Sequence, residues 1–302
     1  MQTIRIGTRE SKLAIWQAEY VQKEIEKLGI KTELVFIKSD GEKDLVSPLY
    51  EMGVQGIFTK TLDIALLDGR IDIAVHSLKD VPTKLPEGII LASVPKRGNY
   101  GDILIHKGTL PEESLEYVIG TSSLRRRAQW LNRYPTHATE PLRGNIQARL
   151  EKLEKNTHWS GAIFAAAAIE RLGLEIENTV ALDWLLPAPA QGALGITCLE
   201  KNKEVIELCR AFNDRDTELA TYIERQFLRT LFGGCSMPIA ALAEFDGDYC
   251  DFRGNILTTD GREKVEVELR VPRDEAMTLG ERAAEEVIRN GGEAILKTFN
   301  RM

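Results

Sequence analysis

The chain has 302 residues, of which 43% are hydrophobic, and a net charge of −7. This length allows two or three domains, each with its own core, and the hydrophobic content is typical of globular proteins and excludes a disordered chain. The acidic balance argues against nucleic acid as the main partner, because a surface that follows phosphates is usually basic.

Strand and helix patterns alternate over the first 95 residues. In chain order the sequence predicts a strand at 4–6, a helix at 13–28, a strand at 34–37, a helix at 57–67 and a strand at 71–75. Thr8 or Ser11 can cap the first helix, and Gly29 ends it. This alternation is typical of a parallel α/β sheet.

The same alternation restarts after the turn-rich segment 95–101, which separates apolar strands at 89–94 and 103–105. Beyond it the sequence predicts a strand at 118–119, helices at 123–133 and 145–154, and a strand at 162–165. The proline-rich break at 186–192 precedes an apolar run at 194–198 that can return to the first sheet. We therefore expect two α/β lobes with a hinged cleft, in which ligands bind at strand carboxyl ends and helix amino termini.

The end of the chain has a different pattern. The sequence predicts a helix at 217–231, strands at 239–245, 249–257 and 264–271, and a helix at 273–290. This order indicates a small α+β domain with an antiparallel sheet. The expected domains are domain 1 at 1–95 plus about 193–212, domain 2 at 101–187 and domain 3 at 216–302.

Arginines collect in one segment of this acidic chain. Between Thr121 and Arg149 there are six arginines, no lysine and a single acid, Glu140. Within this segment a predicted strand is followed by Thr121, Ser122, Ser123, Leu124, Arg125 and Arg126. Hydroxyls, free backbone amides and guanidinium groups should therefore converge at the positive end of a helix. Two adjacent arginines point in different directions on a helix, which suits two separate carboxylates; the alternative is a solvated helix face.

Two smaller groups repeat this arrangement. Arg9 lies with Ser11 at the start of the first helix, and Arg143 and Arg149 bracket a turn that leads into another helix. Cationic groups at several helix starts of a predicted cleft indicate a ligand that carries many carboxylates.

A candidate catalytic residue follows the strand at 71–75. Val81 precedes a proline and must leave the turn in an extended conformation, so Lys79 and Asp80 should lie at the carboxyl edge of the sheet. A carboxylate among cations keeps its charge, and Asp80 therefore suits the stabilisation of a cationic intermediate and the transfer of protons. The alternative is a turn residue paired with a neighbouring lysine.

Cys235 is the candidate for carrying a covalently held group. It lies between two glycines and Pro238, after a helical pattern and before a strand-like run, where a thiol can be presented; the alternative is a small buried hydrophobe. The four cysteines and four histidines are scattered without metal spacing, so we expect reduced thiols and no metal site. A strand-like amino terminus and the absence of a long apolar run predict a cytoplasmic protein with no membrane partner.

The motifs, taken together, resemble the porphobilinogen deaminase (hydroxymethylbilane synthase) family. They are IRIGTRESKLAIWQA, DIAVHSLKDVPTKLP, GTSSLRRRAQW, LRGNIQARL, PAPAQGALGI and GGCSMPIA, and they span nearly the whole chain. The resemblance implies a cytoplasmic, monomeric transferase of tetrapyrrole, porphyrin and haem biosynthesis. Such enzymes condense four porphobilinogen molecules head to tail with release of ammonia, and then hydrolyse off a linear hydroxymethylbilane. It also implies two lobes like those of type II periplasmic binding proteins and a third domain that bears the cysteine.

The resemblance also implies roles for particular residues. Cys235 would hold a dipyrromethane cofactor through a thioether, and Asp80 would stabilise the electrophilic azafulvene cation that forms when ammonia leaves. Lys79 would pair with cofactor carboxylates. The other residues implied to contact cofactor or substrate are Arg9, Ser11, Thr121, Ser122, Ser123, Arg125, Arg126, Arg143, Arg149 and Gln191.

The chain departs from the family pattern at 39–42 and 60–63, where the family commonly has Thr-x-Gly-Asp and Lys-Glu-Leu-Glu. The main rival hypothesis is a non-catalytic carboxylate-binding protein with the same two-lobed fold. Cys235 discriminates between the two, because a binding protein needs no covalent group and releases no ammonia. A degenerate enzyme is disfavoured, since the matching aspartate, cysteine and arginines are all present.

Overall fold

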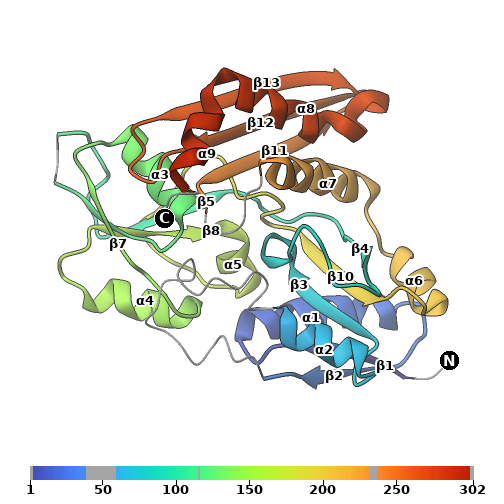
Figure 1. Ribbon diagram of the computed structural model, residues 1–302. Coiled ribbons are helices and arrows are strands. Elements are labelled where there is room, and N and C mark those ends of the chain that lie inside the picture. The colour runs from blue at the N-terminus through green and yellow to red at the C-terminus, as the bar shows by residue number, and fades with distance from the viewer. Residues whose placement is uncertain (1–2, 39–58, 115, 232–236, 300–302) are drawn as a thin grey trace. The chain divides into compact units, whose positions relative to one another are not determined.

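The computed structural model describes residues 3–38, 59–114, 116–231 and 237–299 (Figure 1). These residues form two compact units. The first contains the described residues up to Gly98 together with Gly192–Glu218, and the second contains Asn99–Gln191 together with the described residues from Leu219 onward. Within the described residues the chain passes from the first unit to the second after Gly98 and returns after Gln191, in the turn-rich segments 95–101 and 186–192.

The first unit is built on a five-stranded sheet. Its strand order is β2 (Thr32–Phe36), β1 (Ile4–Thr8), β3 (Ile73–Ser77), β10 (Leu194–Leu199) and β4 (Ile89–Ser93). β1 runs parallel to β2 and β3, whereas β10 is antiparallel to β3 and β4. The run at 194–198 thus returns to the first sheet as predicted. The predicted parallel pairing holds for β1 with β2 and β3, but the sheet as a whole is mixed, because β10 runs in the opposite direction.

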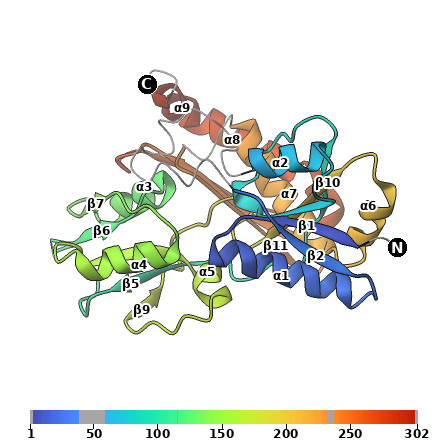
Figure 2. The same cartoon turned by 90° about the horizontal axis from the view of Figure 1, so that it is seen from below.

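Helices cover both faces of this sheet (Figure 2). On one face α1 (Lys12–Glu26) packs against β3, and α6 (Lys203–Arg210) packs against β4 and β10; Ile73 and Val75 of β3 belong to the core on this face. On the other face α2 (Lys60–Leu67) packs around Ala74. Successive strand residues point to opposite faces, so a strand that is covered on both sides must be apolar throughout, as 73–75 is.

The second unit contains a five-stranded sheet of the same topology. Its order is β7 (Ala138–Glu140), β6 (Val118–Gly120), β8 (Gly161–Ala165), β5 (Asp102–His106) and β9 (Thr179–Ala181). β6 is parallel to β7 and β8, and β5 is antiparallel to β8 and β9. α3 (Leu124–Arg133) packs on one face, and α4 (Ile146–Lys155) and α5 (Ala166–Arg171) pack on the other. The sequence did not predict the short strands β7 and β9.

The rest of the second unit is an antiparallel sheet covered by helices, as predicted. The sheet consists of β11 (Ile239–Asp246), β12 (Tyr249–Leu257) and β13 (Lys264–Pro272). The helices are α7 (Arg215–Thr230), whose first four residues belong to the first unit, α8 (Leu279–Val287) and α9 (Glu293–Phe299). Phe227 of α7 meets Phe252 of β12 in their core, with ring centroids 5.2 Å apart.

The single helix predicted at 273–290 is wrong. Arg273–Thr278 is a 3₁₀ helix, α8 follows it, and Ile288–Gly292 is a π turn before α9. Gly291 has a φ of 109°, which residues with a side chain rarely adopt, and there the helical path breaks. None of the helices in the described residues combines the length and apolar character that a membrane span requires.

Candidate active site

The carboxyl end of β3 carries the candidate catalytic residue. β3 ends at Ser77 and passes into one 3₁₀ turn, Leu78–Asp80. Leu78 is fully buried and its amide donates to the Ala193 carbonyl at 3.0 Å, so the turn is anchored to the residue that precedes β10. Lys79 and Asp80 are half-buried at the top of this turn. Both therefore lie at the carboxyl edge of the sheet, as the sequence predicted.

The start of α1 lies at the same edge, because β1 runs parallel to β3. Ser11 caps α1, and its hydroxyl accepts from the Ala14 amide at 3.4 Å. Arg9 lies between the end of β1 and this cap and is half-buried. The first unit thus brings Arg9 and Ser11 to the sheet edge that carries Asp80.

Gln17 belongs to this edge, and the sequence analysis missed it. Its side chain is buried on α1, and its Nε2 donates to the Ser77 hydroxyl at 2.8 Å. This bond ties α1 to the last residue of β3. The available signal was a polar residue on the face of α1 that otherwise holds Ala14, Ala18 and Val21.

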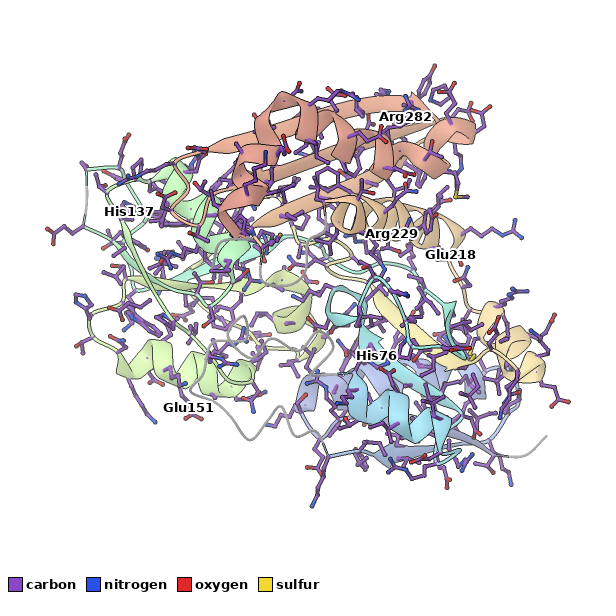
Figure 3. All side chains as sticks on the ribbon, in the orientation of Figure 1. His76, His137, Glu151, Glu218, Arg229 and Arg282 are labelled. Carbon is purple, nitrogen blue, oxygen red and sulfur yellow. The ribbon has the colours of Figure 1, made fainter. Side chains whose placement is uncertain are left out.

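His76 is a buried neutral residue of β3 (Figure 3). Its Nε2 lies 3.2 Å from the Thr197 hydroxyl of β10. Burial, and to a smaller extent the charge of Arg9, lower the pKa of His76 to about 3. The imidazole is therefore uncharged at neutral pH and adds no cation near Asp80.

The predicted anion site of the second unit lies at the start of α3. Ser123 caps this helix, its hydroxyl accepting from the Arg126 amide at 3.4 Å, and the Thr121 hydroxyl accepts from the Ser123 amide at 3.2 Å. Thr121 is buried and Ser122 is exposed. The structure confirms that these hydroxyls gather at a capped helix start.

Arg125 and Arg126 do not point in different directions, which corrects the sequence-based expectation. Both are buried, and both reach back to the carboxylate of Asp102 in β5, each by an Nη2 at 2.7 Å. Burial alone would raise the pKa of Asp102, but the two guanidinium groups outweigh it and lower this pKa to about 2. The sequence could not show this, because Asp102 lies more than 20 residues before the arginines and belongs to another element.

Gln191 completes the surroundings of Asp102. Its Nε2 donates to Asp102 Oδ1 at 2.9 Å and to the Tyr100 carbonyl at 2.8 Å. The preceding Ala190 has a φ of 63°, and its amide donates to buried Glu224 of α7 at 2.6 Å. The Glu224 carboxylate therefore holds Ala190 in this uncommon backbone conformation, which fixes the direction of the Gln191 side chain.

Arg143 and Arg149 flank the start of α4. Asn145 caps that helix, and Arg149 Nε donates to the Gly144 carbonyl at 2.7 Å. Both arginines are half-buried. β7 leads into this loop and pairs in parallel with β6, which leads to Thr121; the Thr121 amide donates to the Glu140 carbonyl at 2.8 Å. The second unit therefore gathers both arginine groups at one sheet edge.

Cys235, the expected attachment point, lies outside the described residues, as does the departure from the family pattern at 39–42. The hinged cleft stays a prediction. Within the described part of the chain no three His, Cys, Asp or Glu residues are grouped so that they could hold a metal ion. The donors at the two edges are guanidinium groups, an ammonium group, hydroxyls and helix amides, which fit a ligand rich in carboxylates.

Comparisons with known proteins cover nearly the whole chain. Residues 4–207 match the family described as "Porphobilinogen deaminase, dipyromethane cofactor binding domain", and residues 219–289 match "Porphobilinogen deaminase, C-terminal domain". Porphobilinogen deaminases of Geotalea uraniireducens and Syntrophotalea carbinolica are each 41% identical over 98% of this chain, and over 94% and 96% of their own lengths.

Solved structures show a weaker similarity. A periplasmic substrate-binding protein of an ABC transporter from Coxiella burnetii covers 72% of this chain and 94% of its own, with a TM-score of 0.43 and 13% identity. The VFT2 domain of Bordetella pertussis BvgS covers 72% of this chain and 89% of its own, with a TM-score of 0.42 and 11% identity.

Proposed function

Because this chain belongs to the porphobilinogen deaminase family, we propose that Cys235 carries its dipyrromethane cofactor and that Asp80 is its catalytic carboxylate. The enzyme is a transferase of tetrapyrrole biosynthesis. It condenses four porphobilinogen molecules head to tail with release of ammonia and produces linear hydroxymethylbilane. The non-catalytic alternative is not favoured.

The attachment at Cys235 is supported by the other three cysteines. Cys198, Cys209 and Cys250 are buried free thiols, and burial raises the pKa of each of them. Burial raises the pKa of Cys198 and of Cys250 to about 11. A thiol of this kind is a poor nucleophile at neutral pH, so none of the three suits the formation of a thioether. When bound, the cofactor supplies the pyrrole terminus onto which the chain is built.

The observation that carries the catalytic proposal is the position of Asp80. It stands half-buried on a rigid turn at the carboxyl edge of the first sheet, beside the start of α1 with Arg9. Loss of ammonia from porphobilinogen leaves positive charge on the substrate. A carboxylate fixed at that point stabilises the developing charge and can hold or pass on a pyrrole proton.

The remaining cationic and polar residues are proposed to bind carboxylates. Each pyrrole carries an acetate and a propionate, so a growing chain presents a row of negative charges. Guanidinium groups bind carboxylates through paired hydrogen bonds, and capped helix starts add amides and hydroxyls. We assign this role to Arg9, Ser11, Lys79, Thr121, Ser122, Ser123, Arg125, Arg126, Arg143, Arg149 and Gln191.

We propose three domains with the boundaries given above, and a monomeric enzyme of the cytoplasm. The three free cysteines agree with a reducing compartment. The net charge of −7 agrees with the absence of a nucleic-acid partner.

The mass of the intact chain under denaturing conditions tests the proposal. The purified protein should carry a covalent excess of two pyrrole units, and this excess should grow in one-pyrrole steps when porphobilinogen is added. The Cys235→Ser variant should carry no excess, while Cys250→Ser, at a buried thiol, should load fully. An unmodified wild-type mass after incubation with porphobilinogen would favour the non-catalytic binding protein, and a loaded Cys235→Ser variant would remove the attachment site.

A further inference from the structure

Asp102 is a fully buried carboxylate that accepts four hydrogen bonds. Arg125 Nη2 donates at 2.7 Å, Arg126 donates through Nη2 at 2.7 Å and Nε at 3.2 Å, and Gln191 Nε2 donates at 2.9 Å. The family resemblance assigned roles to the three donor residues but none to Asp102.

The two guanidinium groups are fixed on their other sides as well. Arg125 Nη1 donates to the Leu186 carbonyl at 2.7 Å, and Arg126 Nη1 donates to the Ile163 carbonyl at 2.9 Å. Each arginine is thus held between a backbone carbonyl and a shared carboxylate. The usual rotamer freedom of an arginine is lost before any ligand arrives, which lowers the entropic cost of binding.

The charges of this cluster do not balance. Two buried cations face one buried anion, so the cluster bears a net charge of +1 in a place where Arg125 is 5% and Arg126 is 6% exposed. An uncompensated buried charge is costly, and Arg125 Nε is also buried without a hydrogen-bond partner. Both features call for one further anion, and the small exposed area suits a single carboxylate.

We propose that Asp102 is a positioning residue that holds Arg125 and Arg126 together as one anion site with a net charge of +1. This inference rests on the proposed function. The pair then binds one carboxylate of porphobilinogen or of the growing chain, where the sequence suggested two. Asp102 does not touch the ligand; it acts through the two guanidinium groups.

The Asp102→Asn variant tests this. An amide offers one acceptor and turns a donor toward the other arginine, so the pair should separate. We expect the porphobilinogen concentration for half-maximal loading of the apoprotein, read from intact mass, and the KM of the loaded enzyme each to rise about tenfold, with kcat changed less. Asp102→Glu should restore part of the loss, because it keeps the carboxylate.

A matched control is Asp72→Asn in the first unit. Asp72 also forms a two-bond pair with an arginine, Arg5, at 2.8 and 3.0 Å, but it precedes the amino end of β3, opposite the end that leads to Asp80. This variant should lose stability and keep the wild-type loading concentration and KM. A folded Asp102→Asn variant with wild-type values for both quantities would overturn the proposal.

A second comparison covers the case in which Asp102→Asn does not fold. Arg125→Gln leaves one cation and one anion, and adding Asp102→Asn to it isolates the action of Asp102 on Arg126. The double variant should need several times more porphobilinogen than Arg125→Gln alone; equal requirements would overturn the positioning role. Failure of the proposed function would be seen separately, since the wild-type chain would then neither load nor consume porphobilinogen.

Discussion

At the scale of single residues, the site combines side chains that the sequence identifies with side chains that only the fold explains. Asp80 and Arg9 follow apolar strands, and their place at a sheet edge could be predicted from that order. Gln17 and Asp102 could not be predicted, because their partners, Ser77 and the arginine pair, lie on other elements. Local sequence predicts the element that carries a side chain, but it does not predict which distant group that side chain contacts.

The role of Asp80 leads to a prediction about turnover. Asp80→Asn keeps the size of the side chain and removes its charge, so the folded structure should persist while the cationic intermediate loses its stabiliser. We expect ammonia release to fall by at least about a hundredfold, with an unchanged melting temperature. Asp68→Asn, at an exposed aspartate after α2, is the control and should retain full turnover. Near-normal ammonia release by Asp80→Asn would exclude a catalytic role.

The buried neutral state of His76 leads to a prediction about acid stability. Its pKa is lowered to about 3 in the folded chain, against about 6.5 when unfolded. Between these values only the unfolded chain binds the proton, so stability falls as the pH is lowered from about 6.5 toward 3. His76→Gln removes this contribution. Urea unfolding at pH 7.5 and pH 5 should show a loss up to about 2 kcal/mol larger for the wild type than for the variant. Equal losses of stability in the wild type and the variant would mean that burial does not lower the pKa of His76.

At the scale of elements, the caps and long apolar patterns were predictable and the short or broken elements were not. Ser11, Ser123 and Asn145 cap the three helices whose starts they were expected to mark or precede. β7 and β9 have three residues each and, unlike β6, contain no two adjacent large apolar residues, so neither shows a strand pattern. The break between α8 and α9 depends on one glycine, whose positive φ cannot be distinguished in advance from that of any exposed glycine.

The packing of α8 on α7 leads to the prediction that a Gly→Ala substitution in a helix lowers stability instead of raising it. Gly280 lies in the first turn of α8, and a Cβ added there would lie 2.0 Å from the Ile223 carbonyl oxygen of α7. Gly→Ala in a helix normally stabilises a protein by up to about 1 kcal/mol. Here the clash should reverse the effect, and Gly280→Ala should lose about 1–3 kcal/mol in urea unfolding. Arg282→Ala, at an exposed position of the same helix (Figure 3), should be nearly neutral. A stabilised Gly280→Ala variant would mean that the two helices can separate at little cost.

At the scale of the whole molecule, the sequence predicted two α/β sheets and a terminal antiparallel sheet, and these are present. The mixed direction of the strands escaped prediction for a physical reason. An apolar run covered on both faces has the same composition in either direction, so β5 and β10 resemble their parallel neighbours in sequence. Only the path of the chain, which enters each sheet from the other unit, decides their orientation.

The contribution of β10 to the first sheet has a consequence for synthesis on the ribosome. β10 pairs with β3, and Leu194 lies opposite Ser77, so the first sheet cannot be completed until more than half of the chain has been made. The five strands of the second sheet all lie between Asp102 and Ala181 and emerge earlier as a full set. A nascent chain can therefore complete the sheet of the second unit before that of the first. Until β10 has been synthesised, the edge of β3 that pairs with it stays without a partner strand.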